Sequence, residues 1–121
     1  MEKPIFKLSE YSDGEMIFAK RKPEDDLRDE FVGNIAYAIL TFWNKHKKNK
    51  IRIDFSYEGK TISDDCVNTT IHLQEGFFFI RPIQDVADVI RKRAEAIVRA
   101  VERKVGLSEI ESYCVKNSII G

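Results

Sequence analysis

The sequence is poor in cysteine and histidine, the side chains that form most zinc sites. Its two cysteines, Cys66 and Cys114, lie 48 positions apart, and its two histidines, His46 and His72, lie in different segments. A zinc site usually takes its ligands from closely spaced pairs, so no metal is expected. Two cysteines without a disulfide framework are typical of reduced thiols in a cytoplasmic protein.

Long hydrophobic runs are also missing. No stretch of the sequence approaches the roughly 18 apolar residues that a membrane-spanning helix needs. The first residues, Met1 to Pro4, are not followed by the apolar segment of a secretory leader. We therefore expect a cytoplasmic protein with no membrane partner.

Neither sign of charge is in excess. The chain has 20 Lys plus Arg and 20 Asp plus Glu, which argues against a general polyanion binder because such proteins carry a strong basic excess. A hydrophobic content of 43%, with only 6 Gly and 3 Pro, is typical of a folded chain and excludes intrinsic disorder. The length of 121 residues predicts one domain, spanning 1–121.

The first clear element is a helix that we expect to begin near Pro23. Proline followed by acidic residues is typical of a helix start, and the basic segment 45–48 followed by Asn49 is typical of a helix end. The apolar residues within 31–43 cover a wider arc than one core contact requires. Either the rest of the chain wraps this helix on two sides, or a second subunit covers it.

Alternation of apolar and polar residues predicts strands after this helix. Residues 51–57 form a half-buried strand, 58–60 a turn or bulge, and 61–66 irregular or edge structure. The segments 67–74 and 77–81 then form an antiparallel hairpin around Glu75 and Gly76. Two further strands, 5–8 and 16–20, flank a turn at 12–14.

A second helix begins at Pro82, and its apolar residues recur every three or four positions as far as Val105, with Gly106 as the C-cap. Ser108 and Glu111 have capping-box spacing, which predicts a short final helix. The element order is therefore ββαβββαα. It indicates the α+β class: a single antiparallel β-sheet with two long helices and a short C-terminal helix layered on it.

The predicted hairpin contains the main candidate binding site. With a two-residue loop, His72 lies opposite Phe79, and Phe77 and Arg81 share the same face, while the preceding strand adds Arg52. Aromatic rings beside guanidinium groups can stack a base and pair with a phosphate or carboxylate. The competing explanation, which we favour, is that this face is buried by other segments or by another subunit.

Arg93 of the second helix is a further candidate. Most bases on this helix have an acid one turn away, such as Asp88 with Lys92, which is typical of a solvated charged face. Arg93 has no acid four residues away and lies near the apolar arc. We therefore expect it to contribute to ligand or partner binding more than to folding, together with Phe79 and Arg81.

Catalytic motifs are scarce. Asp54, Glu58 and Lys60 match the residue types of metal-dependent nucleases, in which two carboxylates hold a divalent cation. Both acids lie on one strand instead of on neighbouring strands, so solvent-exposed charges are the simpler interpretation. The sequence contains no nucleophile elbow, phosphate-binding glycine loop or HExxH motif. We expect no catalytic residues and no cofactor.

These patterns favour a small non-enzymatic binding protein that occupies a protein partner or a small anionic ligand. Inhibitors, immunity proteins and accessory proteins of bacteria and phages are often compact domains of this kind, which is an argument from frequency alone. The alternative is a nucleotide or nucleic-acid binding protein, and a nuclease is a minor alternative. We also expect a homodimer, because the first helix, Phe77 and Phe79 present more apolar surface than one small domain covers.

Overall fold

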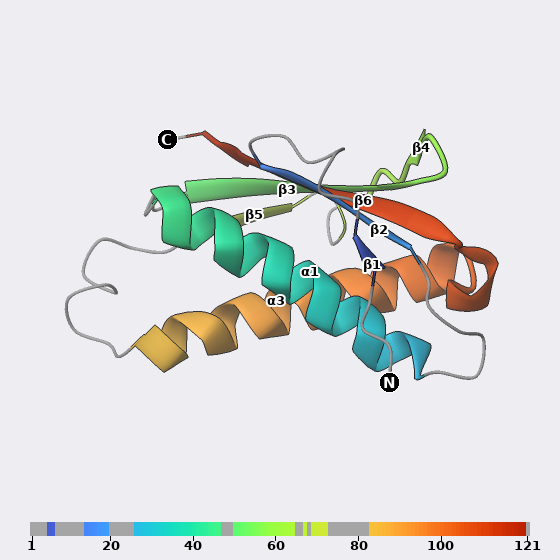
Figure 1. Cartoon of the computed structure of the whole chain (residues 1–121), viewed down its shortest axis with the longest axis horizontal. Helices are drawn as coiled ribbons and strands as arrows, with labels where there is room; N and C mark the ends of the chain where they lie inside the picture. Colours follow the sequence, from blue (N-terminus) through green and yellow to red (C-terminus); the bar gives the residue numbers. More distant parts are fainter. Residues whose placement is uncertain are drawn as a thin grey trace.

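The computed structural model describes residues 5–6, 14–19, 26–46, 50–64, 67, 69–72 and 83–120. Two long helices and six strands make up most of this part of the chain (Figure 1). In chain order the elements are β1 (Ile5–Phe6), β2 (Glu15–Ala19), α1 (Leu27–His46), β3 (Lys50–Tyr57), β4 (Lys60–Thr61), β5 (Thr69–His72), α3 (Ile83–Lys104), the 3₁₀ turn η2 (Leu107–Glu109) and β6 (Ser112–Ile119).

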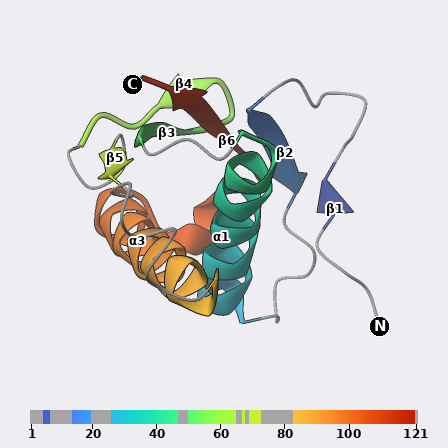
Figure 2. The ribbon, with the colours of Figure 1, turned by 90° about the vertical axis from the view of Figure 1, so that its left-hand side faces the viewer.

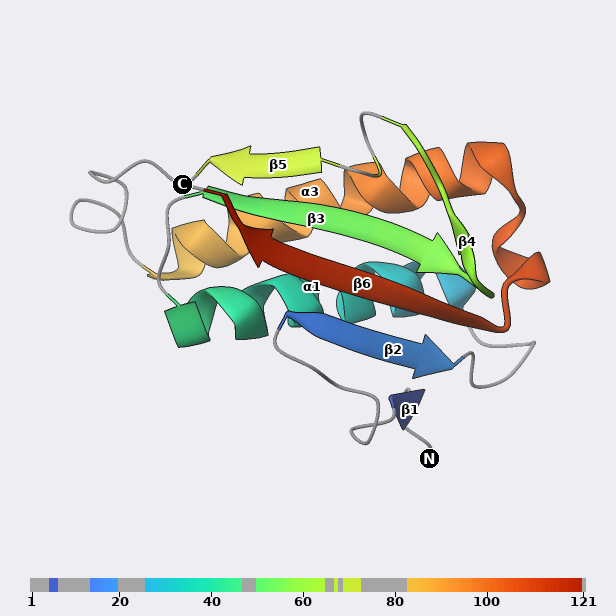
Figure 3. The ribbon, with the colours of Figure 1, turned by 90° about the horizontal axis from the view of Figure 1, so that it is seen from above.

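The strands form one antiparallel sheet in the order β1, β2, β6, β3, β4, with β5 also pairing with β3. The strands β4 and β5 follow one another along the same side of β3, and β6 lies along its other side (Figure 3). Both long helices pack on one face of this sheet (Figure 2). The predicted α+β class, with one antiparallel sheet and two long helices, is confirmed.

Alternation along the strands places the core between the sheet and the helices. In β3 the apolar residues Ile51, Ile53 and Phe55 are fully buried, whereas Arg52 is exposed. The neighbouring strands follow the same period, because Val115 lies opposite Phe55 and is also fully buried. The predicted strand at 51–57 is therefore confirmed, and its polar residues lie on the face away from the helices.

The turn predicted at 58–60 is present as the two residues Glu58 and Gly59, whereas Lys60 already belongs to β4. Glu58 and Gly59 both have positive φ angles, of 47° and 81°, which is the pattern of a two-residue hairpin turn that matches the twist of its strands. Lys60 and Thr61 then pair back with β3. The next predicted strand, 67–74, appears as β5 at Thr69–His72, whereas its proposed partner at 77–81 lies outside the described residues.

The first helix begins later than predicted. Its first residue is Leu27, and Asp26 precedes it in a non-helical conformation, so the helix does not run continuously from Pro23. The reason is a local cap: the Asp26 carboxylate accepts a hydrogen bond of 3.4 Å from the Asp29 amide, and the Asp26 carbonyl accepts one of 3.1 Å from the Glu30 amide.

The wide apolar arc of α1 is covered by the chain itself. One part of the arc packs against the sheet and another against α3. Phe31, Ile35, Ile39 and Trp43 are all buried, and of the large apolar side chains of this helix only Tyr37 is strongly exposed. Of the two explanations for the arc, the structure favours wrapping by the same chain.

The predicted short C-terminal helix is wrong. Only one 3₁₀ turn forms, at Leu107–Glu109, and Ser112–Ile119 is instead the strand β6, which pairs with β2 on one side and β3 on the other. The capping-box spacing misled the prediction, because Glu111 lies beyond the turn and its amide donates to the Glu58 carboxylate at 3.0 Å. The structure follows the alternation of the buried residues Tyr113, Val115 and Asn117, which is the pattern of a strand.

The predicted role of Gly106 is also wrong. It has a φ of −55° and ψ of 139°, so it is not the left-handed residue that ends many helices, and it precedes the 3₁₀ turn. Positive φ occurs instead at Gly59 in the β3–β4 turn and at Gly14 before β2, with φ 88°. The two predicted N-terminal strands are present as β1 and β2, which pair through Ile5 with Ala19 and Phe6 with Phe18.

Candidate functional site

The sequence-predicted site falls largely outside what the structure describes. Phe77, Phe79 and Arg81 lie outside the described residues, as does the side chain of His72. The backbone of His72 lies opposite Lys50 at the end of β5. The aromatic half of the predicted site therefore stays a prediction.

The other two predicted residues, Arg52 and Arg93, lie on opposite sides of the sheet. Arg52 lies opposite Thr70 on the face away from the helices, and its Nε donates to both oxygens of Asp54, at 3.0 and 3.2 Å. Arg93 belongs to α3, under the sheet, next to Ile71. The two guanidinium groups therefore belong to different faces of the sheet.

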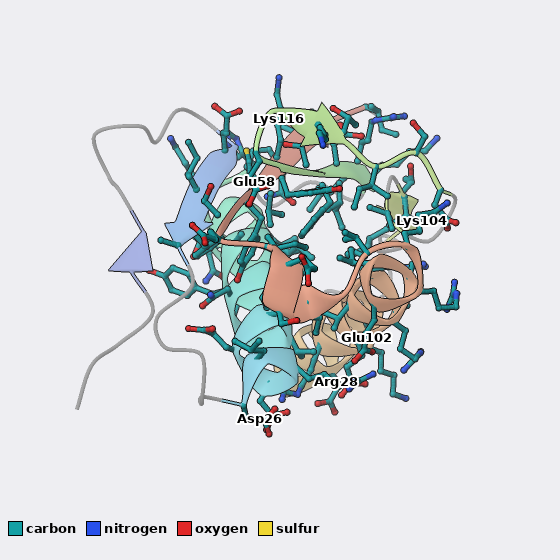
Figure 4. The ribbon with its side chains drawn as sticks, turned by 90° about the vertical axis from the view of Figure 1, so that its right-hand side faces the viewer. Asp26, Arg28, Glu58, Glu102, Lys104 and Lys116 are labelled. Atoms are coloured by element: carbon teal, nitrogen blue, oxygen red, sulfur yellow. The ribbon has the colours of Figure 1, made fainter. Side chains whose placement is uncertain are left out.

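The described part of the open sheet face is polar and balanced in charge. Lys116 lies between Asp54 and Glu15 in the strand register and projects away from the helices (Figure 4). No Phe, Tyr or Trp occupies this face among the described strand residues. The described part of this face therefore offers no stacking platform, and Phe77 and Phe79, on which the nucleotide-binding alternative depends, lie outside it.

A groove lies between the edge strand β5 and α3. It has a volume of about 270 Å³ and is lined by Ile71 from β5 and by Val89, Lys92, Arg93 and Ala96 from α3. We call it the β5–α3 groove. The four helix residues follow the spacing i, i+3, i+4, i+7, which brings them onto one stripe of the helix surface. Three apolar side chains and two cationic ones therefore share this opening.

Among the described residues, the cover over this side of α3 stops partway along the helix. Ala100 continues the same stripe one turn after Ala96 but is fully buried. The chain after β4 contributes Ile62 and Val67 to the same core, and Asp64 pairs with Lys104 at 3.6 Å near the end of the helix. Toward the start of the helix, in contrast, Val89 keeps 36% of its surface exposed.

The two cations of the groove have no ion-pair partner in the part of the chain that the structure describes. The described ion pairs of α3 are made by other residues: Glu102 pairs with Arg28 of α1 at 3.5 Å, and Lys104 pairs with Asp64 (Figure 4). Lys92 and Arg93 make none. The described lining of the groove is therefore cationic as well as partly apolar.

The buried polar pair in the core is structural. Asn34 of α1 donates a hydrogen bond of 2.7 Å to the Tyr113 hydroxyl, whose ring stacks on Phe31 and Phe55 at centroid distances of 4.3 and 5.5 Å. Burial raises the pKa of Tyr113 well above its usual value; the Asn34 hydrogen bond opposes this shift, and the nearby charge of Glu30 adds to it. This tyrosine stays neutral and ties α1 to β6.

The thiol of Cys114 is unsuited to nucleophilic chemistry. It lies on the open sheet face, half-buried, and donates a hydrogen bond of 3.5 Å to the Glu15 carboxylate. Burial and the Glu15 charge raise the pKa of Cys114 from 9.0 to about 12. Because the thiolate is the reactive form, this environment suppresses reactivity near neutral pH.

The nuclease-like set does not converge on a common point. Asp54 pairs with Arg52, Glu58 accepts the Glu111 amide, and the Lys60 ammonium lies 6.0 Å from the Tyr57 ring centre. Within the described residues, no group of three or more His, Cys, Asp or Glu side chains could hold a metal ion. This set therefore offers no support for the nuclease alternative.

Comparisons of the chain with protein-family models, with curated proteins and with solved structures find no match. None of the described helices is long and apolar enough to cross a membrane. The function of the protein is therefore inferred from its own geometry.

Sequence reasoning identified Arg93 but missed the groove in which it lies. Val89, Lys92 and Ala96 each follow ordinary helix patterns and carry no motif. The available signal was the absence of an acid four residues from Arg93, which does distinguish it from its neighbours. The groove itself requires the pairing of β5 with β3, which places Ile71 over the helix.

Proposed function

We propose that this protein is a non-enzymatic binding protein whose ligand occupies the β5–α3 groove. The observation that supports this proposal is the groove itself, an opening of about 270 Å³ that combines apolar side chains with two cations. Small-molecule sites are typically concave, mostly apolar and equipped with a few polar groups that fix orientation. Their volumes run from roughly 300 to 1,000 Å³, so this groove suits a small ligand.

The described surface supports binding better than catalysis. Among the described residues the groove is lined by no histidine, cysteine, aspartate or glutamate, and its one lysine, Lys92, is an exposed side chain and not the desolvated amine that serves as a nucleophile. The half-buried thiol of Cys114 lies on the other face of the sheet and has a raised pKa. A ligand held beside Val89 and Ala96 would be retained there chemically unchanged.

The test fills the groove without changing the rest of the helix. Ala96→Phe places a ring inside the groove, whereas Arg103→Phe places the same ring on an exposed position of α3 as a matched control. The probes are hexanoate and its neutral amide, hexanamide, titrated into each protein and followed by calorimetry. Circular dichroism verifies that both variants remain folded.

We expect the wild type to bind hexanoate, hexanamide or both. For each probe that binds, Arg103→Phe should have the same affinity as the wild type. Ala96→Phe should bind such a probe at least about tenfold more weakly, because the ring removes the space that the alkyl chain occupies. Absence of binding of both probes to the wild type would contradict the proposal. Equal affinity of the two variants would place the ligand somewhere else.

A further inference from the structure

The β5–α3 groove has a chemical polarity that points to one class of ligand. Arg93 and Lys92 lie side by side on the helix stripe, while Ile71, Val89 and Ala96 supply the rest of the lining. Neither cation is paired within the described residues: Asp88, one turn before Lys92, and Glu95, next to Ala96, make no ion pair with them. The cationic side of the groove is therefore open to a ligand.

We infer that the groove binds a small organic oxyanion, a carboxylate or phosphate group carried on a compact apolar body. This inference rests on the proposed function and adds the chemical class of the ligand. The planar guanidinium of Arg93 presents paired donors that match the geometry of an oxyanion, and the Lys92 ammonium adds a second positive charge. The apolar body of the ligand lies against Ile71 and Val89.

The partial burial of Arg93 strengthens this pairing. Its side chain is half-buried, whereas Arg99 and Arg103 on the same helix are exposed. A charge-assisted hydrogen bond gains more in a partly desolvated groove than on the open surface, where water and salt screen it. Arg93 therefore contributes more to anion binding than the exposed arginines of α3, which provide matched controls.

The arrangement does not suit a nucleic-acid backbone. Such a ligand needs a track of basic residues along its length, but the exposed face of α3 mixes Arg91 and Arg99 with Asp88 and Glu102. The basic residues of the groove are two neighbours at one point. A single anionic group on a small molecule fits this arrangement.

The experiment compares ligands of equal shape and different charge on the intact chain. Hexanoate, phenyl phosphate and inorganic phosphate are the anionic probes, and hexanamide is the neutral one. The variants are Arg93→Gln and the double change Lys92→Gln with Arg93→Gln, with Arg99→Gln as the control that removes the same charge outside the groove. Dissociation constants are measured by titration at low and high salt.

We expect hexanoate or phenyl phosphate to bind the wild type about tenfold more tightly than hexanamide. Arg93→Gln should remove most of this preference and leave hexanamide binding unchanged, which also verifies that the groove is intact. Arg99→Gln should keep the preference, and higher salt should reduce it. A preference for phenyl phosphate or for hexanoate decides which oxyanion the site prefers.

Equal affinity of the wild type for hexanoate and hexanamide would overturn the inference while leaving the proposed function intact. An anion preference that survives in the double variant would also overturn it, because the charges responsible would lie elsewhere. Binding of inorganic phosphate as tightly as phenyl phosphate would contradict the role of the apolar lining. Failure of every probe would contradict both proposals.

Discussion

The fold excludes a side chain at Gly14 and accepts one at Gly33. Gly14 has a φ of 88°, and a Cβ added there would overlap the backbone oxygen of Asn117, which belongs to β6. Gly33 lies within α1, and an added Cβ would meet no atom within 4 Å. One glycine is required by the approach of two strands, and the other only weakens a helix.

Gly14→Ala should therefore lower the free energy of unfolding by more than about 2 kcal/mol, because it combines left-handed strain with a backbone overlap. Gly33→Ala should raise it by about 0.5 to 1 kcal/mol, since alanine favours the helix. Urea denaturation of the two variants measures both effects. Equal destabilisation would mean that the pairing of β2 with β6 is not as described.

Cys114 links stability to alkaline pH. Its pKa is raised from 9.0 to about 12 by burial and by Glu15, so the folded state keeps the proton that the unfolded chain loses above about pH 9. The stabilising contribution is therefore complete below pH 9 and is lost as the pH rises toward 12.

The measurement is the urea midpoint across this alkaline range. Wild type should lose stability more steeply than Cys114→Ala between pH 9 and pH 12. Cys66→Ala leaves Cys114 in place and should follow the wild-type slope. A slope that is unchanged in Cys114→Ala would show that this thiol titrates alike in the folded and unfolded chain.

At the scale of elements, the start of α1 depends on one side chain. The Asp26 carboxylate accepts the Asp29 amide, an unpaired donor of the first helical turn. Asp26→Ala should cost about 1 kcal/mol of stability, whereas Asp26→Asn should retain most of it. Asp29→Ala is the control, since it removes a first-turn charge without removing the cap and should cost only about 0.3 kcal/mol. Thermal unfolding distinguishes these variants, and equal losses for Asp26→Ala and Asp29→Ala would argue against the cap.

The strand β3 and the helix α3 were predictable because each has a single unambiguous period, whereas α1, with its wide apolar arc, was predictable mainly from the basic segment at its end. Ile51, Ile53 and Phe55 alternate strictly, and the apolar residues of α3 recur at three and four over its whole length. The last strand was not predictable by the same means. The strand comes directly after Ser108 and Glu111, whose capping-box spacing predicts a helix. Its own alternation of buried residues becomes decisive only because it pairs with both β2 and β3.

The candidate site was predictable only in part, for a physical reason. A single residue without a nearby acid, Arg93, is visible in the sequence, but a groove depends on what covers each side of a helix. Ala96 and Ala100 are the same residue type on the same stripe of α3, yet only Ala100 is fully buried. That difference arises from the chain after β4 and the position of β5, which local patterns do not specify.

At the scale of the whole molecule, the burial of α1 bears on assembly. The apolar arc that suggested a homodimer is covered by the sheet and by α3, and the remaining argument for self-association, Phe77 and Phe79, lies outside the described residues. The covered arc therefore no longer supports self-association, and the homodimer stays a prediction that depends on Phe77 and Phe79. Light scattering at high micromolar concentration tests it: a particle of twice 14.0 kDa would agree with a homodimer, and a particle of 14.0 kDa would contradict it.

The proposed ligand site is the β5–α3 groove and not the open face of the sheet. The most direct measurement is the change in backbone amide chemical shifts on titrating hexanoate into the ¹⁵N-labelled protein. We predict that the largest shifts fall on Ile71, Val89 and Ala96, while Glu15 and Lys116, in the strands β2 and β6 away from β5, stay unchanged. Largest shifts at Glu15 and Lys116, or no saturable shift at Ile71, Val89 and Ala96, would contradict this proposal.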